Sequence, residues 1–185
     1  KWEETLDAIE GYPSVEGDGV SYYYKKKFGI PYQNFLAGNG STEMIYLIPR
    51  VLRMKRVLII TPSYNDYERA SVLAGSKVTR SRLLPDTAFS FPDMDALIAE
   101  LNNSDGLWLG RPNNPTGNLF PKGQLLELAD RFPDHLFILD EAFIQFVDRR
   151  TENSLMTGNI RPNILVVHSL TKFYALAGLR IGGVV

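Results

Sequence analysis

The sequence has 185 residues, 44% hydrophobic and 22% charged, a balance that is ordinary for a soluble globular protein of one domain. With a formal net charge of −1, we predict neither a nucleic-acid nor a membrane partner. Cysteine is absent, which excludes disulfide and thiolate chemistry and favours an intracellular, cytoplasmic setting. No apolar run approaches the length of a membrane span. Because the chain starts at Lys1 without methionine and stops within an apolar run, we expect it to be part of a longer protein.

The N-terminal part of the sequence contains short helical patterns separated by turns. We expect helices over residues 2–9 and 20–28, the second carrying the one basic cluster of the chain as a solvated face, and a short strand over residues 34–37. The proline after Tyr12 breaks the first helix, because a residue that precedes proline avoids helical geometry.

A glycine turn, Gly38-Asn-Gly-Ser-Thr-Glu43, then opens into an apolar segment over residues 44–48. Such a turn leaves free backbone amides at the positive end of a helix, which favours an anion. The motif is neither a P-loop nor a complete dinucleotide fingerprint, since the third glycine and the Gly-Lys pair are absent. Ser41 or Thr42 acting as a plain N-cap explains the same residues. We expect Pro49 to interrupt or kink this helix.

The rest of the chain alternates apolar runs with helical patterns. Runs that read as strands cover residues 57–60, 76–84, 106–109, 136–139 and 164–167. Helices are expected over residues 65–73, from Pro92 with an inward stripe that ends at Leu101, and from Pro121, whereas residues 148–153 read as a polar loop. Unbroken apolar runs suit strands that are buried on both faces. The alternation therefore predicts an α/β fold, a mostly parallel central sheet with helices on both faces.

Four of the apolar runs are followed by side chains that can do chemistry. These are Tyr64, then Asn113 and Asn114, then Asp140, then Ser169 with Lys172. Parallel strands end at the same edge of a sheet, and ligands of such sheets bind at that edge. We therefore expect these side chains to converge on one site.

Lys172 and Arg180 indicate what the site binds. A lysine held against an apolar surround loses solvation, so its pKa falls and its amine becomes nucleophilic. An arginine offers a planar fork that suits a phosphate. The pair suggests a carbonyl cofactor that carries a phosphate. A solvated surface lysine and an ion-pairing arginine are the alternative.

Together the residues at the strand ends fit pyridoxal phosphate. Lys172 would form a Schiff base with its aldehyde, and Asp140 would pair with the protonated ring nitrogen. Asn114 would hydrogen-bond the ring hydroxyl, and Tyr64 would stack on the ring. The phosphate would be held by Arg180, Ser169 and the backbone amides of Ser41 and Thr42. A buried N-cap, a turn former and a core aromatic are the alternative interpretations of Asp140, Asn114 and Tyr64.

The chain resembles the class I/II aminotransferases among the fold-type-I pyridoxal-phosphate enzymes. The motifs that carry the resemblance span nearly the whole chain and are Gly38-Asn-Gly-Ser-Thr-Glu43, Pro62-Ser-Tyr64, Pro112-Asn-Asn-Pro-Thr-Gly117, Asp140-Glu-Ala-Phe143 and Ser169-Leu-Thr-Lys172 through Arg180. The chain is most similar to the branch that holds threonine-phosphate decarboxylase and histidinol-phosphate aminotransferase. The resemblance implies that residues 1–185 form a partial pyridoxal-phosphate-binding large domain, without the N-terminal arm and the C-terminal small domain. It also implies a homodimer without a metal, in which Tyr12 reaches the cofactor phosphate of the neighbouring subunit; a packed loop aromatic is the alternative for Tyr12.

Two departures from the family pattern bear on the activity. Phe143 stands where the aminotransferases of this branch usually carry tyrosine, and the phosphothreonine decarboxylases resemble the chain here and in Ser169-Leu-Thr-Lys-Phe-Tyr174. Thr42 stands where many relatives have aspartate, so its backbone amide is the expected contact. The resemblance implies an L-threonine-O-3-phosphate decarboxylase acting on a phosphorylated amino acid. The alternatives are a histidinol-phosphate aminotransferase and, in another class, a regulator that kept a cofactor-sensing domain.

Overall fold

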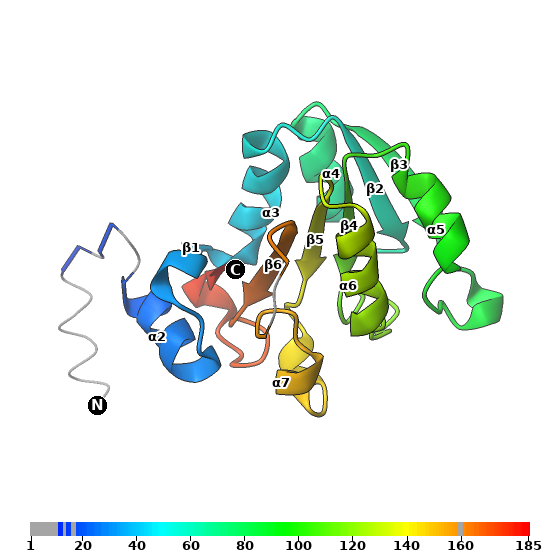
Figure 1. The fold of residues 1–185 in the computed structure, drawn as a ribbon. Coiled ribbons are helices and arrows are strands. Elements are labelled where there is room, and N and C mark those ends of the chain that lie inside the picture. The colour runs from blue at the N-terminus through cyan, green and yellow to red at the C-terminus, as the bar shows by residue number, and fades with distance from the viewer. Residues whose placement is uncertain (1–10, 13, 16–17, 159–160) are drawn as a thin grey trace.

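The computed structural model describes residues 11–12, 14–15, 18–158 and 161–185 and shows one sheet with helices on both faces (Figure 1). The strands are β1 Leu36–Asn39, β2 Arg56–Thr61, β3 Lys77–Arg82, β4 Gly106–Gly110, β5 Leu136–Asp140, β6 Ile164–Ser169 and β7 Ile181–Val184. The α-helices are α2 Asp18–Phe28, α3 Gly40–Val51, α4 Asn65–Leu73, α5 Met94–Leu101, α6 Lys122–Arg131 and α7 Arg150–Asn153. Short 3-10 helices cover Tyr32–Asn34, Pro85–Thr87, Ile144–Phe146 and Ala177–Leu179. The helix expected over residues 2–9 lies outside the described residues. No helix in the described ranges is long and apolar enough to cross a membrane.

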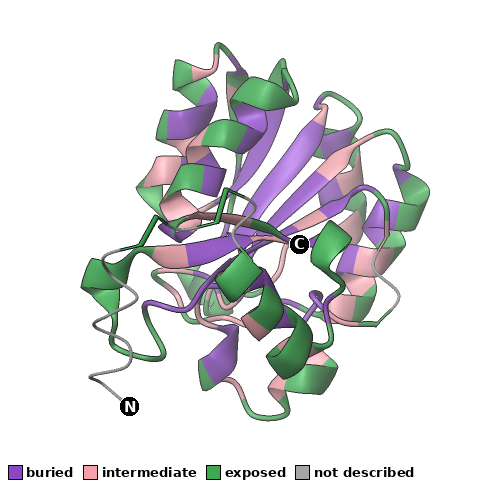
Figure 2. Ribbon diagram, turned by 90° about the vertical axis from the view of Figure 1, so that its left-hand side faces the viewer, coloured by how far each residue is buried: buried purple, intermediate pink, exposed green. Residues whose placement is uncertain are grey.

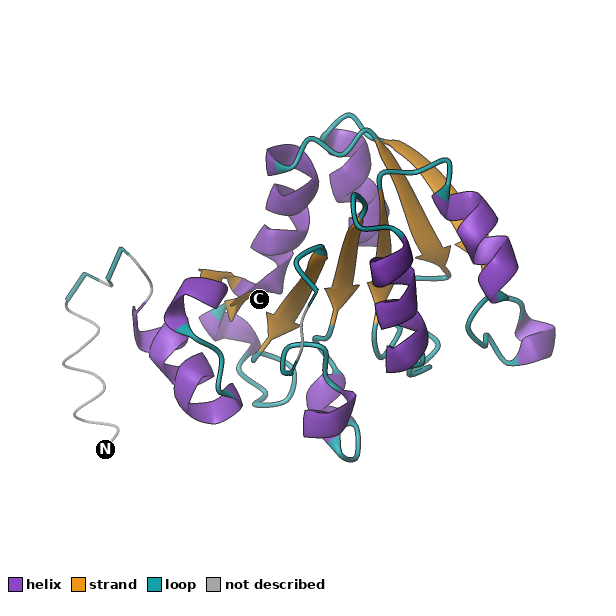
Figure 3. Ribbon diagram, in the orientation of Figure 1, coloured by secondary structure: helices purple, strands orange, loops and turns teal. Residues whose placement is uncertain are grey.

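The seven strands lie in the order β1-β7-β6-β5-β4-β2-β3. β2 pairs in parallel with β3 and β4, and β5 pairs in parallel with β4 and β6. β7 is the exception, because it runs antiparallel to both β6 and β1. The predicted α/β fold with a mostly parallel sheet and helices on both faces is therefore confirmed (Figure 3).

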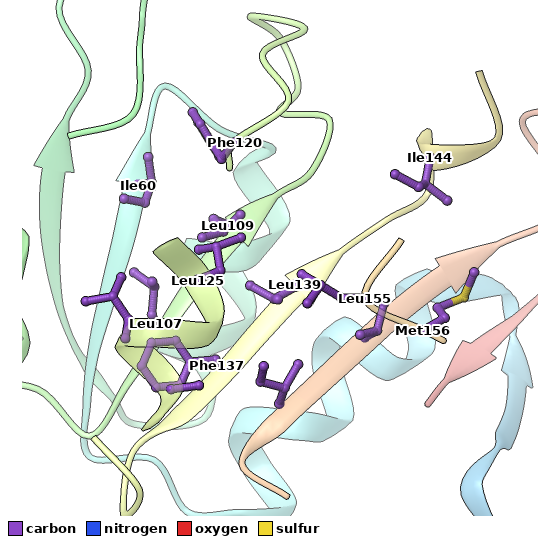
Figure 4. Packing of buried hydrophobic residues seen from close by; sticks show 14 of the residues in the cluster. Ile60, Leu107, Leu109, Phe120, Leu125, Phe137, Leu139, Ile144, Leu155 and Met156 are labelled. Carbon is purple, nitrogen blue, oxygen red and sulfur yellow. The ribbon is translucent and has the colours of Figure 1, made fainter. Parts of the chain in front are cut away.

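The inner strands are buried on both faces, and alternate residues supply two separate hydrophobic clusters. Leu58 and Ile60 of β2 face the cluster completed by α5 and α6, shown in Figure 4. Val57 and Ile59 face the cluster completed by α3 and α4. Figure 2 shows the result, with buried strands in the middle and exposed outer helix faces. Each fully buried leucine or isoleucine contributes about 1.5–3 kcal/mol relative to an exposed one, so these clusters fix the strand ends that carry the polar residues.

The interruption expected at Pro49 and the polar loop expected over residues 148–153 were wrong, whereas a kink at Pro49 stays a prediction. α3 continues through Pro49 to Val51, and the backbone bonds from Leu52 to Ile48 and from Met54 to Pro49 close its last turn. Proline lacks the amide donor and its ring crowds the carbonyl four residues earlier, but Pro49 lies two residues before the end of α3, so few helical bonds are affected. The segment expected to be a polar loop contains the short helix α7, which begins after Arg149.

Candidate active site

A pocket lies at the carboxyl ends of the parallel strands, where the sheet meets the start of α3. Its walls include Ser41, Thr42, Tyr64, Asn114, Asp140, Ser169, Lys172 and Arg180. The site residues expected from the sequence are thus brought together except Asn113 and Tyr12, which do not line this pocket. Tyr12 is fully exposed and lies outside the pocket, and its expected contact with a neighbouring subunit stays a prediction.

The start of α3 forms one wall of the pocket and depends on Gly40. Its φ of +74° is in the left-handed region, and a Cβ there would lie 2.6 Å from the Nη2 atom of Arg180. A glycine therefore lets the guanidinium approach the first amides of the helix. Nη2 of Arg180 also donates to Oγ1 of Thr42 at 3.5 Å. The N-cap residue is Asn39 and makes no side-chain cap, so the interpretation of Ser41 or Thr42 as a plain N-cap is wrong.

Glu43 closes this turn from within the helix. Its Oε2 accepts a hydrogen bond from the Asn39 amide at 2.7 Å, which fixes the entry of the chain into α3. Gly182 of β7 packs against the same turn, because a Cβ there would lie 2.7 Å from the Ser41 amide nitrogen. Glu43 and Gly182 thus hold the turn from two sides. The free amides at the start of α3 remain directed toward the pocket.

Asp140 ends β5 and is 6% exposed. Its Oδ1 accepts a hydrogen bond from the Ala142 amide at 2.9 Å, and its Oδ2 accepts one from the Tyr67 hydroxyl at 2.8 Å. Burial raises the pKa of Asp140, whereas the Ala142 amide, the Tyr67 hydroxyl and the charge of Lys172 act in the opposite direction. The carboxyl of Asp140 is therefore buried, held by two hydrogen bonds, and lines the pocket near Lys172.

Tyr67 is a pocket residue that the sequence reasoning missed. It lies three residues after Tyr64 on α4, is 2% exposed, and stacks on Trp108 with ring centroids 5.0 Å apart. The spacing of three residues could have identified it, because such residues share one face of a helix. Its hydroxyl orients Asp140, and its ring contacts Tyr64 edge-on at 5.7 Å.

The two adjacent asparagines have different environments. Nδ2 of Asn113 donates to the Pro62 carbonyl at 3.0 Å and to Thr116 Oγ1 at 2.9 Å, so this side chain joins two turns. Asn114 lines the pocket. Of the two asparagines, Asn114 is therefore the one that can meet a ligand in this pocket.

Ser169 and Lys172 follow β6. The hydroxyls of Ser169 and Thr171 are 2.8 Å apart, and both residues are buried. Lys172 lines the pocket but is exposed, as is every residue from there to Arg180. The expected apolar surround of this lysine was therefore wrong, because the turn after β6 leaves the core immediately.

The pocket thus contains three kinds of group. Arg180, hydroxyls and helix amides form a cluster that suits an anion such as a phosphate. Asp140 supplies a buried carboxyl that can accept a proton or a hydrogen bond from a ligand. Lys172 supplies an amine that can attack a carbonyl carbon.

Comparison with known proteins gives consistent matches. A family model for aminotransferase class I and II matches residues 8–185. The chain is 38% identical over 184 residues to a threonine-phosphate decarboxylase from Salmonella typhimurium, covering 97% of this chain and 49% of the relative. It is 33% identical over 174 residues to a histidinol-phosphate aminotransferase from an Anaeromyxobacter species, covering 89% of this chain and 47% of that protein.

The fold comparison agrees with the sequence comparison. The solved histidinol-phosphate aminotransferase from Clostridium acetobutylicum superposes with a TM-score of 0.85 at 28% identity, covering 98% of this chain and 54% of that one. The chain spans about half the length of the curated relatives it matches. Because the family model covers nearly all of the sequence, the chain belongs to the class I and II aminotransferase family.

Proposed function

We propose that this chain is the cofactor-binding part of a pyridoxal-phosphate-dependent enzyme that acts at the amino group and Cα of a phosphorylated amino acid. The observation that carries the proposal is the opening of Lys172 and the buried Asp140 onto one pocket, together with the anion-binding cluster at Arg180. These three kinds of group match the aldehyde, the ring nitrogen and the phosphate of that cofactor.

The residues present fit the cofactor group by group. Ser41, Thr42, Ser169 and Arg180 would hold the phosphate, Asn114 the ring hydroxyl, and Tyr64 a ring face. When bound, pyridoxal phosphate supplies a conjugated ring that withdraws electrons from the substrate carbon. The two hydrogen bonds that Asp140 accepts keep its carboxylate oriented toward the pocket, which favours a protonated nitrogen beside it. Tyr67 therefore acts by positioning Asp140.

Lys172 would have two tasks. Its amine would hold the cofactor until a substrate amine replaces it, and once free it can carry a proton to or from the substrate Cα. Its exposed position leaves it free to make that movement.

Among the activities of this family we favour L-threonine-O-3-phosphate decarboxylation. The relative from Salmonella typhimurium carries the name threonine-phosphate decarboxylase, and Phe143 lines the pocket without the hydroxyl that aminotransferases of this branch usually place there. Histidinol-phosphate transamination is the alternative, supported by the Anaeromyxobacter relative. A regulator that binds the cofactor without turnover is the alternative from another class.

Three further properties belong to the proposal. The enzyme would be a homodimer in which Tyr12 of one subunit reaches the cofactor phosphate of the other. Residues 1–185 would be part of its large domain. The setting would be cytoplasmic, which the absence of cysteine favours.

The test uses the full-length protein loaded with pyridoxal phosphate. O-phosphothreonine without a keto acid should release carbon dioxide, whereas histidinol phosphate with 2-oxoglutarate should give little product. Lys172→Ala should abolish both turnover and the absorbance of the Schiff base between this lysine and the cofactor, and Lys77→Ala, on the edge strand β3, should change neither. Transamination of histidinol phosphate without carbon dioxide release from O-phosphothreonine would favour the aminotransferase. Cofactor binding without either reaction would favour the regulator.

A further inference from the structure

The segment that carries Lys172 has little packing of its own. Residues 172–180 are all exposed. Their backbone bonds are local, such as those from Ala175 to Lys172 and from Leu176 to Thr171. Such bonds fix the shape of a turn but leave open where the turn lies relative to the sheet. Side-chain contacts to other elements must therefore position it.

A hydroxyl pair joins this segment to α2. The phenolic oxygens of Tyr23 and Tyr174 are 2.6 Å apart, and the two rings meet edge to face with centroids 6.4 Å apart. Tyr174 follows Lys172 by two residues, and Tyr23 lies 151 residues away in sequence. Burial, followed by the hydrogen bond with Tyr174, raises the pKa of Tyr23 to about 12. The Tyr23 phenol therefore stays neutral at physiological pH, and either hydroxyl can donate to the other.

The helix α2 is itself fixed to the sheet. Tyr24 is fully buried and stacks on Phe35 at 3.8 Å. Its hydroxyl lies 2.7 Å from Nδ1 of His168, the residue of β6 that precedes Ser169. The neighbour of Tyr23 is thus tied to the same strand from which the Lys172 segment emerges, so Tyr23 is a firm point of attachment.

The segment has two further contacts with other elements among the described residues. At its far end Nη2 of Arg180 donates to Oγ1 of Thr42 in α3 at 3.5 Å, which is long for a hydrogen bond. The second contact, through aromatic rings, is less directional. Phe173 meets Phe146 edge to face at 5.3 Å, and the Arg150 guanidinium lies 6.0 Å from the Phe173 ring. Ring contacts of this kind resist separation but allow sliding. Among residues 173–179, the Tyr174 hydroxyl makes the one side-chain hydrogen bond to another element within the described part of the chain.

We propose that Tyr23 and Tyr174 are positioning residues for Lys172. Through the hydroxyl pair of the two tyrosines, α2 holds the turn that carries Lys172 in a fixed position relative to Asp140. The inference rests on the proposed function for its chemical meaning, because Lys172 must be the cofactor-holding amine. The restraint of residues 172–180 by α2 does not depend on the cofactor.

Hydrogen exchange of the cofactor-free, full-length protein tests the restraint. Tyr23→Phe and Tyr174→Phe keep both rings and remove the hydrogen bond. The amides of Tyr174, Ala175 and Leu176 should exchange about fivefold faster in each variant, the factor expected from one net hydrogen bond. The double variant should match the single ones, because the two hydroxyls act as a pair. Tyr22→Phe is the matched control, since no described residue hydrogen-bonds its hydroxyl and its exchange should equal that of the wild type.

A second measurement connects the restraint to Lys172. The pH titration of the absorbance of the bound cofactor should shift in Tyr23→Phe and Tyr174→Phe but not in Tyr22→Phe, whereas the unfolding temperature of the cofactor-free protein should change little in all three. Exchange rates in Tyr23→Phe equal to those in Tyr22→Phe would overturn the inference. So would an unshifted titration together with accelerated exchange. If the wild-type protein takes up no cofactor, that result counts against the proposed function. The exchange rates of the cofactor-free protein then still test the restraint by α2.

Discussion

The buried ion pair between Arg111 and Glu141 gives a sharp stability prediction for Glu141→Gln. The side chains of Arg111 and Glu141 are 1% and 0% exposed, and their Nη1 and Oε1 atoms are 3.1 Å apart. The Glu141 carboxylate also accepts hydrogen bonds from the Ser154 hydroxyl at 2.6 Å and the Leu155 amide at 2.9 Å. The substitution would keep the shape of the side chain and one acceptor oxygen but remove the charge that compensates Arg111.

The magnitude follows from the burial. Burial lowers the pKa of Arg111 and raises the pKa of Glu141, so for each group desolvation outweighs the attraction of its partner. The ion pair therefore contributes little net stability to the fold. Removing the charge of Glu141 nevertheless leaves the buried cation of Arg111 uncompensated. Removal of one partner of a buried pair costs about 3–5 kcal/mol, and we expect about 3 kcal/mol because the amide oxygen still accepts a bond.

The assay is urea unfolding of the full-length protein, with the free energy extrapolated to water. Glu68→Gln is the matched control, because Glu68 pairs with Arg80 on the surface, where their side chains are 36% and 47% exposed. Such pairs contribute about 0–1 kcal/mol. If Glu141→Gln costs no more than Glu68→Gln, the argument from desolvation is wrong.

Three further predictions concern pH and the pocket. Burial lowers the pKa of His168 to about 3. The unfolded chain, with an imidazole pKa of about 6.5, therefore takes up the proton first, and stability falls by about 2 kcal/mol from pH 7 to pH 5. His168→Gln should remove that part of the dependence in urea unfolding at each pH, and an unchanged slope would contradict the burial argument. Tyr67→Phe removes a donor to the Asp140 carboxylate, so kcat should fall about tenfold or more, while Tyr46→Phe, whose hydroxyl contacts Asp66 outside the pocket, should not change it. Arg180→Ala should raise the dissociation constant of pyridoxal phosphate about tenfold or more in equilibrium dialysis, and equal retention would remove Arg180 from the phosphate cluster.

Much of the fold and the site could be predicted because the chemistry sits at the ends of unbroken apolar runs. The runs before Tyr64, Asn113, Asp140 and Ser169 are buried on both faces, and such runs separated by helical patterns favour parallel pairing. Once the strands are parallel, their ends converge. That geometry predicts where the pocket lies, whereas its wall at the start of α3 also depends on Gly40 and Arg180.

The features that escaped prediction depend on contacts between distant segments. β7 has the sequence Ile-Gly-Gly-Val, which lacks a strand-like pattern, and its glycines allow close pairing, since a Cβ at Gly183 would collide with the Leu36 carbonyl of β1. The spacing from Tyr64 could have singled out Tyr67, but its hydrogen bond to Asp140 joins α4 to β5, and no local pattern relates those residues. The contact between Tyr23 and Tyr174 joins residues that no local pattern relates.

The strand β3 closes one side of the sheet and leaves one row of its backbone donors and acceptors unpaired by another strand within the described residues. An open row of this kind invites a second molecule to extend the sheet, which is a common start of aggregation. Lys77, Arg80 and Arg82 occupy half of the six positions of β3. Arg80 is paired with Glu68, so Lys77 and Arg82 are the charges that two such borders would set against each other, and this repulsion would disfavour edge-to-edge pairing.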